Sequence, residues 1–523
     1  MKHKKLIICV AVVVAVLGIG HFTLDRIALN NLNKALGDIP GTEIKVGRVF
    51  ISLIAGNLEL HDVEFNVSDT SRFGHKVDGG VDLIKLEDLH WKTLFKGEAR
   101  ADRLLVRGPH ASIVLDENVP QEKRDSARRE AEASFFKDIF LDEVDVENCA
   151  VSVEGNTSSM KASVKDFSMA VHDICVSLPD GEVQYNDSTY SVAIDSLDFI
   201  DPQGLSRITL GHLATADAGA VEAIGLHAYN CVAQEQLAEK MGKVSVMWYD
   251  VMLDTLSTSA INIPRMVTEK KIDIESVHLS SSSMVLLQDD RYPPAVPYAT
   301  IQEGLNTLEM PLNIKKIDGN VKLLTFIWET SHVNRGAFPL HNLRLALKSV
   351  SNAKGNVMNM NIRSGKKSGG SLNLTINVKN DKQETTKGTM IIENLEADTL
   401  DPFMRPLFGA TAQADIHKID CSFNGNKTKL DADFCMLYDN LSLKAWDDSS
   451  APFKIVAQNS GLVTFLANIA VAKRNPYADG HNPKTVAFSV ERDPMKPYPT
   501  YIIQCLTTGM LKTVLPGGST VKK

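Results

Sequence analysis

The chain has 523 residues, a formal net charge of -8 and a pI of about 6.0. Apolar residues make up 44% of it and charged residues 23%, which excludes wholesale disorder and a protein with many membrane spans. A nucleic-acid binder usually has a basic surface, and the acidic pI gives no indication of one. The length predicts several domains or one elongated architecture.

The N-terminus predicts a single membrane anchor. Lysines at positions 2, 4 and 5 precede an apolar run over residues 6–24, and about 20 such residues span a bilayer as a helix. A cleaved signal peptide is the rival interpretation, although no convincing A-x-A site follows. Lysines before the span and Asp25 after it predict a cytoplasmic N-terminus, with the rest of the chain on the other side of the membrane. The side chains predicted to face lipid are Leu6, Val10, Val13, Val14, Leu17, Phe22 and Leu24.

Helical spacing is confined to a few later segments. The pattern predicts helices near residues 27–36, 234–241, 461–473 and 506–515. Residues 121–134 are highly charged and predict a solvated helix or a linker.

Period-two alternation dominates the rest of the chain, which predicts strands with one apolar and one polar face. The segments 58–65 and 272–279 share the pattern most strictly, with one extra residue that kinks each strand. The glycine-rich segment 365–370 lies between two such patterns and predicts a hairpin loop, because a phosphate-binding loop would be followed by a helix.

The predicted organisation has six parts. They are a cytoplasmic tip at residues 1–5, the anchor at 6–24, an N-terminal β module at 25–120, the charged helix or linker at 121–134, a long repetitive β-sheet region at 135–459, and a C-terminal helix, strand and closing helix at 460–523.

Motifs for catalysis do not occur in the sequence. There is no H-E-x-x-H, nucleophile elbow, dinucleotide fingerprint or P-loop, and the closest histidines, His332 and His341, are nine residues apart. We therefore predict no catalytic residues, no metal site, no cofactor and no enzyme. The sequence does not determine which cysteines form disulfides. A bond between Cys421 and Cys435 is the simplest pairing to suggest.

Three stretches carry a resemblance to a known family. Residues 44–60 read as strand, small-residue turn and strand, and residues 97–109 as a glycine-led strand that ends in proline before another alternating strand. With the single N-terminal span, these segments resemble the AsmA-like family of bacterial envelope proteins. At the other end, residues 462–468, 474–476 and 486–493 look like the tail of its Bacteroidetes-type members.

The resemblance implies a mainly β fold: an elongated, twisted, antiparallel-rich sheet curled into a groove with an apolar lining, with one transmembrane helix and a few short helices. It implies an inner-membrane-anchored periplasmic protein that supports outer-membrane biogenesis by phospholipid transfer. The residues predicted to line the groove are Leu58, Leu60, Val63, Phe65, Ile113, Leu115, Val144, Val146, Ile272, Ile274, Val277, Leu279, Leu372, Leu374 and Ile376.

The expected partners are membrane phospholipid as cargo, the inner membrane, and a periplasmic or outer-membrane protein, without nucleic acid. Two other functions stay open. One is a periplasmic scaffold that offers sheet edges to outer-membrane proteins during their targeting and assembly, without lipid transport. The other is an enzyme whose site no motif reveals.

Overall fold

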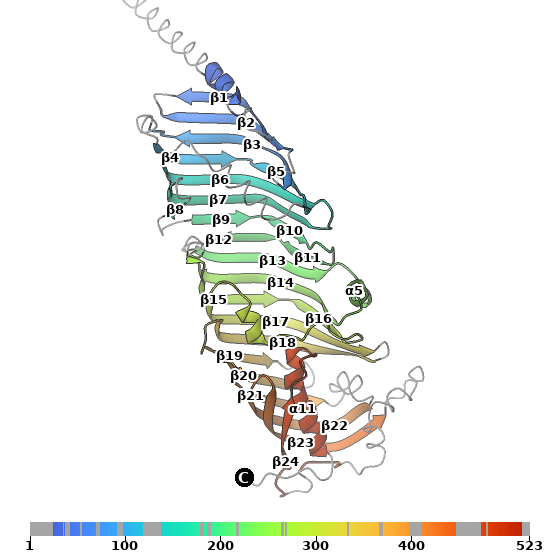
Figure 1. The fold of residues 1–523 in the computed structure, drawn as a ribbon. Coiled ribbons are helices and arrows are strands. Elements are labelled where there is room, and N and C mark those ends of the chain that lie inside the picture. The colour runs from blue at the N-terminus through green and yellow to red at the C-terminus, as the bar shows by residue number, and fades with distance from the viewer. Residues whose placement is uncertain are drawn as a thin grey trace, which may run out of the picture. The chain divides into compact units, whose positions relative to one another are not determined.

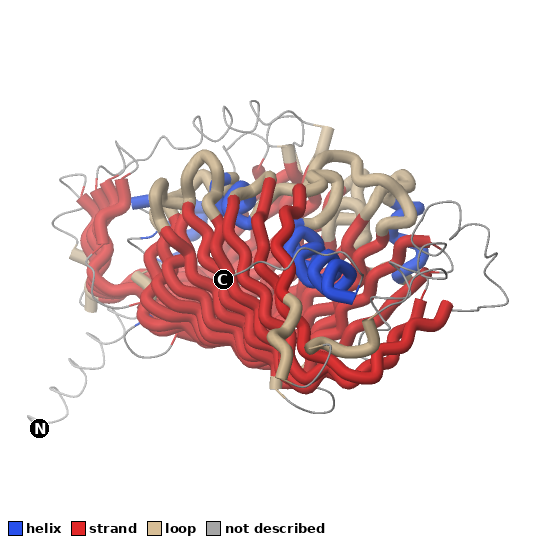
Figure 2. The backbone as a smooth tube through the Cα atoms, turned by 90° about the horizontal axis from the view of Figure 1, so that it is seen from below, coloured by secondary structure: helices blue, strands red, loops and turns tan. Residues whose placement is uncertain are grey.

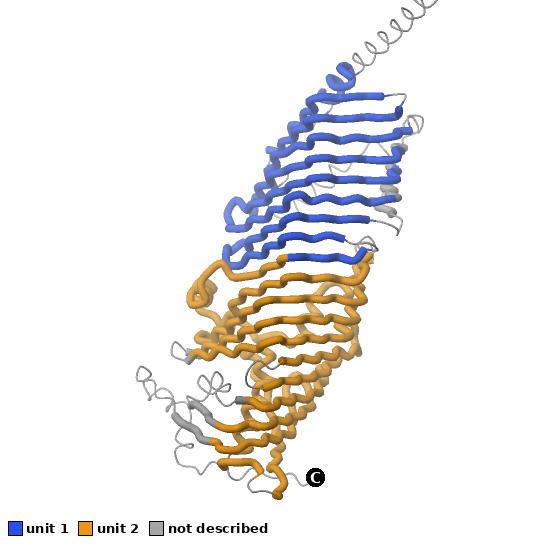
Figure 3. The backbone as a smooth tube through the Cα atoms, turned by 180° about the vertical axis from the view of Figure 1, so that it is seen from behind, with its two compact units in different colours: residues 1–224 blue, residues 225–523 orange. Residues whose placement is uncertain are grey.

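The computed structural model divides into two compact units, residues 1–224 and 225–523 (Figure 3). The division falls inside the region predicted as continuous from 135 to 459. The structure describes residues 25–34, 36, 42–52, 55–68, 74–90, 98–118, 138–177, 182–185, 190–215, 219–262, 266, 269–331, 334–365, 370–396, 410–445, 472–476 and 480–514.

Unit 1 is built from β-strands (Figure 1). They are β1 (Thr42–Ser52), β2 (Asn57–Val67), β3 (His75–Glu87), β4 (Glu98–Arg107), β5 (His110–Leu115), β6 (Asp138–Gly155), β7 (Lys161–Ser177), β8 (Glu182–Tyr185), β9 (Tyr190–Ile194), β10 (Ser196–Ile200), β11 (Ser206–Leu210) and β12 (His212–Thr215). Strand β13 (Ala220–Asn230) continues past the unit boundary.

Unit 2 contains further strands and three helices in its described part (Figure 1). The strands are β14 (Val246–Ala260), β15 (Ile272–Ser281), β16 (Ser283–Asp289), β17 (Leu312–Ser331), β18 (Asn334–Ser351), β19 (Val357–Ser364), β20 (Ser371–Lys379), β21 (Thr386–Glu396), β22 (Ala410–Gly425), β23 (Lys429–Ala445) and β24 (Thr485–Glu491). The helices are α5 (Gln234–Lys240), α7 (Ile301–Asn306) and α11 (Tyr498–Val514). The mainly β prediction is confirmed.

Most neighbouring strands pair antiparallel, and the exceptions form a repeated motif. In unit 1 the interrupted strand β4–β5 runs parallel to β6, and in unit 2 the interrupted strand β15–β16 runs parallel to β17. The parallel partners are 40 residues apart in both units, as Arg107 with Glu147 and Asp273 with Asn313 illustrate. The same structural motif therefore occurs once in each unit.

The kink predicted within residues 58–65 exists and has a conformational cause. Asp62 adopts a left-handed backbone conformation with φ 52°, which aspartate tolerates better than most residues. Pairing between β1 and β2 skips Gly47 and Asp62, because both strands carry an extra residue there. The kink returns Val63 to the side of the sheet that Leu60 occupies, and both pack in one apolar cluster. Asn148, Asp166, Asn342, Ser349, Asn394 and Asn440 adopt the same conformation within β6, β7, β18, β21 and β23.

The largest core lies in unit 2, where α11 packs on β22, β23 and β24. Figure 1 shows α11 lying against these strands, and Figure 2 shows helices beside curved strands in a second view. Phe434 of β23 and Cys421 of β22 are directly paired, and each has 1% exposure or less. Gly509 of α11 lies so close to Phe434 that an added Cβ would be 2.3 Å from the ring. The apolar face of this part of the sheet is therefore covered.

Some of the predicted helices are present in the structure, and others fall outside the described residues. Residues 25–34 are helical and α5 confirms the helix near 234–241. The last helix begins at Tyr498, earlier than predicted, because Pro499 lies in its first turn, where a missing N–H costs nothing. The predicted anchor at 6–24, the charged segment 121–134 and the amphipathic segment 461–473 lie largely outside the described residues, and within the described part no helix has the length and apolarity to cross a bilayer.

The suggested pairing of Cys421 with Cys435 is wrong. Strand register places Cys421 opposite Phe434 and Cys435 opposite Asp420, so the two side chains lie on opposite faces of the sheet. Both are free thiols.

The hairpin prediction for 365–370 is confirmed, since this segment joins the antiparallel neighbours β19 and β20.

Candidate functional site

Apolar side chains form a row across unit 1. Leu60 lies beside Ile84, Ile84 beside Val106, and Val106 beside Val146. The row continues to Met169 of β7. Paired residues of neighbouring strands point to the same side of a sheet, so these five side chains share one face. We call this side the apolar face of unit 1.

Parallel rows widen this face on both sides of the first row. One row joins β2, β3, β5, β6 and β7, and a second joins β2, β3, β4, β6 and β7. The members are Phe65, Gly79, Ala111, Val151 and Val164 in the former and Leu58, Leu86, Leu104, Val144 and Val171 in the latter. Neighbouring strands are about 4.8 Å apart, so each row extends roughly 20 Å.

The predicted lining residues of unit 1 all lie on this face. They are Leu58, Leu60, Val63, Phe65, Ile113, Leu115, Val144 and Val146, and apart from buried Val63 they are half-buried. The prediction missed Leu197 and Phe199 of β10, which pair with Val164 and Ala162 of β7. The alternation of the segment SLDFI is the signal that would have found them.

Fully buried residues on the apolar face of unit 1 are few in the part of the chain that the structure describes. Val46, Val49 and Val63 form a cluster that partly buries Leu29 and Leu32 of the helix at residues 25–34. Leu89, Ala101 and Leu141 form a second small cluster. Much of the apolar face therefore carries side chains that remain accessible.

The predicted lining residues of unit 2 have different surroundings. Ile272, Ile274, Val277 and Leu279 of β15 align with β17, and Ile272 packs against the large core. Leu372 and Leu374 pack against the same core, and Ile376 is only 5% exposed within it. Ile376 is therefore a core residue and does not line an open groove.

The opposite side of the unit 1 sheet carries ion pairs. Lys85 Nζ lies 2.8 Å from Glu87 Oε1, and Arg107 Nε lies 2.8 Å from Glu147 Oε2. The Lys85 hydrogen bond is the main cause that lowers the pKa of Glu87, and the hydrogen bond to Asp145 raises the pKa of Arg103. The two faces of the sheet therefore differ in polarity.

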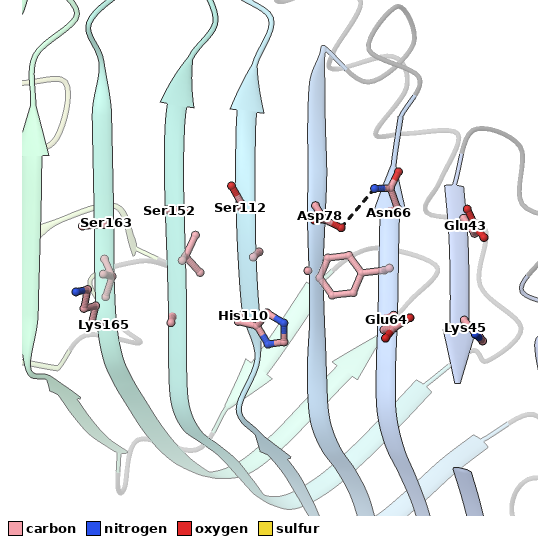
Figure 4. Close-up of a pocket in the computed structure, with 16 residues that line it drawn as sticks. Glu43, Lys45, Glu64, Asn66, Asp78, His110, Ser112, Ser152, Ser163 and Lys165 are labelled. Carbon is pink, nitrogen blue, oxygen red and sulfur yellow. Dashed lines mark hydrogen bonds between the residues drawn. The ribbon is translucent and has the colours of Figure 1, made fainter. Parts of the chain in front are cut away.

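A cavity of about 710 Å³ lies along β1, β2, β3, β5, β6 and β7 (Figure 4), and its lining combines polar side chains with members of one apolar row, Phe65, Ala111, Val151 and Val164. Asp78, Ser112, Ser152 and Ser163 form a row of directly paired residues along it. Asn66 Nδ2 donates a hydrogen bond to Asp78 Oδ1 over 3.4 Å. The cavity offers hydroxyl, amide and carboxylate groups for hydrogen bonds to a polar molecule.

Among the described residues no group of three or more His, Cys, Asp or Glu side chains has a geometry that could hold a metal ion. A second cavity of about 670 Å³ is lined mainly by carboxylates and includes Glu87, Asp102 and Glu143. Arg103 and His172 also line it, so its charge is partly balanced.

No family model matches this sequence, and no curated protein sequence is significantly similar to it.

Proposed function

We propose that the chain is an AsmA-like envelope protein, anchored in the inner membrane, whose apolar face in unit 1 carries lipid acyl chains. In this proposal it supports outer-membrane biogenesis by transferring phospholipid through the periplasm. The protein performs no catalysis and needs no cofactor. The observation that carries the proposal is the set of apolar rows in unit 1, whose side chains are half-buried.

Burial of acyl chains explains why such a face is useful. Each methylene removed from water is worth roughly 0.8 kcal/mol, so a chain of about sixteen methylenes gains about 13 kcal/mol on a face that covers it. The half-buried row from Leu60 to Met169 supplies hydrocarbon surface of this kind. The headgroup stays in water, beyond the edge of the face.

The test is lipid bound to the purified full chain, measured by mass spectrometry after exchange into a lipid-free detergent. Ile113→Glu places a charge on the apolar face, and Val114→Glu places the same charge on the next residue, whose side chain is 37% exposed on the opposite face. We expect bound phospholipid in the wild type and in Val114→Glu, and a loss of at least fivefold in Ile113→Glu.

Equal lipid content in the two variants would refute the role of the apolar face. Recovery of bound outer-membrane proteins with no lipid would favour the scaffold function instead.

A further inference from the structure

Two cysteines belong to the covered core of unit 2. Cys421 lies in β22 and Cys505 in α11, both are free thiols, and both have 0% exposure. They belong to one apolar cluster, and α11 packs on β22. This pair is distinct from the apolar face of unit 1.

Phe434 is a neighbour of Cys421 in the sheet and of α11, the helix that contains Cys505. It is the directly paired neighbour of Cys421 on the adjacent strand. Its ring also touches Gly509, which is one helical turn beyond Cys505 on the same side of α11. Burial raises the pKa of Cys421 to about 12, and the negative charge of a Cys505 thiolate is the next largest cause of that rise. Cys421 therefore lies near enough to Cys505 to sense its charge.

We propose that Cys421 and Cys505 are a disulfide site that fastens α11 to the sheet. The oxidant is a small-molecule disulfide such as oxidised glutathione. The Cys505 thiolate attacks it, forms a mixed disulfide and releases one glutathione thiolate. The Cys421 thiolate then attacks the Cys505 sulfur and releases the second. Two protein thiols are oxidised, one glutathione disulfide is reduced to two thiols, and the two protons pass to the released glutathione.

The packing of α11 on the sheet limits the rate of this oxidation. A buried thiol with a raised pKa has little thiolate and no access to glutathione disulfide. Oxidation therefore requires α11 to leave the sheet, either before it first docks or during a later opening. Once formed, the disulfide holds α11 on the sheet.

The test incubates the full chain with a glutathione redox buffer in sub-denaturing urea, traps free thiols with iodoacetamide and digests without reduction. Trypsin releases Cys421 in residues 419–427 and Cys505 in residues 493–512. We expect these two peptides to be linked in most molecules, and the reaction to be at least tenfold slower without urea. Cys505→Ala should abolish the link. Cys435→Ala should leave it intact, because Cys435 lies on the other face of the sheet.

A second readout covers the case in which Cys505→Ala fails to fold. The oxidised wild type should unfold at a higher urea concentration than the reduced wild type. If Cys421 remains free, joins glutathione alone or links to another cysteine in the urea-treated chain, the proposal is overturned.

Discussion

Arg291 is a buried cation beside two buried carboxylates. Its Nη2 lies 2.6 Å from Asp289 Oδ2 and its Nε lies 3.6 Å from Glu329 Oε1, and the three side chains are 5%, 1% and 8% exposed. The hydrogen bond to Asp289 is the main cause that raises the pKa of Arg291. Removing the cation would leave two acids in a low-dielectric site with no counter-charge.

Arg291→Met is therefore expected to lower the free energy of unfolding by about 3–5 kcal/mol, measured by urea denaturation. Arg335→Met is the matched control, because Arg335 is 39% exposed and pairs at 3.5 Å with Glu235, which is itself 60% exposed. A surface pair of this kind is worth about 0–1 kcal/mol. Similar losses in the two variants would contradict this account of the buried pair.

Glu384 is a carboxyl whose charged form is disfavoured by burial, which raises its pKa. The folded chain then holds this proton more tightly than the unfolded chain, so the carboxyl costs stability once the pH exceeds its unfolded pKa. Glu384→Gln should match the wild type at acid pH and become the more stable protein as the pH rises through the unfolded and folded pKa values. Urea unfolding across pH measures the difference, and Glu309→Gln at an exposed position should show no such trend.

At the scale of elements, the fit of α11 depends on one glycine. An added Cβ at Gly509 would lie 2.3 Å from Phe434 Cγ, far closer than an ordinary van der Waals contact. Gly304 of α7 offers a contrast, since nothing lies within 4 Å of its added Cβ.

Gly509→Ala should destabilise unit 2 by about 1–3 kcal/mol through overpacking, although alanine favours helix by about 1 kcal/mol. Gly304→Ala should be neutral or stabilising by up to about 1 kcal/mol, because only the helix preference acts there. Urea unfolding gives both values. A stabilising Gly509→Ala would mean that α11 does not pack closely on Phe434.

The elements also show what the sequence could and could not predict. Alternation around Leu58 and Ile272 identified strands, and the extra residue in each pattern identified kinks, because both are local properties of the chain. The alternation of Cys421 with Ile419 and Phe423 is another local pattern, and all three residues are buried on one face. The fate of Ile376 was not predictable, because its alternation resembles that of Ile113 and only tertiary packing decides which apolar face is covered.

The parallel pairing of β4–β5 with β6 and of β15–β16 with β17 was also beyond the sequence. An alternating strand has the same pattern in parallel and antiparallel partners, so the pattern does not reveal the direction of pairing. The shared separation of 40 residues is visible only once the register is known.

At the scale of the whole molecule, the two units differ in what covers their apolar side chains. Unit 2 has a large core that includes Ile419, Phe434 and Tyr501, each at most 1% exposed. The described part of unit 1 has small clusters and rows of half-buried residues. The proposed lipid function therefore belongs to unit 1, and unit 2 contributes a filled core.

Photo-cross-linking in intact cells tests this claim most directly. A benzophenone amino acid at Phe65 places the reactive group on the apolar face, and the same group at the adjacent Asn66 places it on the exposed polar face. We predict lipid adducts at position 65, detected by mass spectrometry of the purified chain, and at least tenfold fewer at position 66. Equal labelling at both positions, or adducts only with protein at position 65, would contradict the proposal that acyl chains lie on the apolar face.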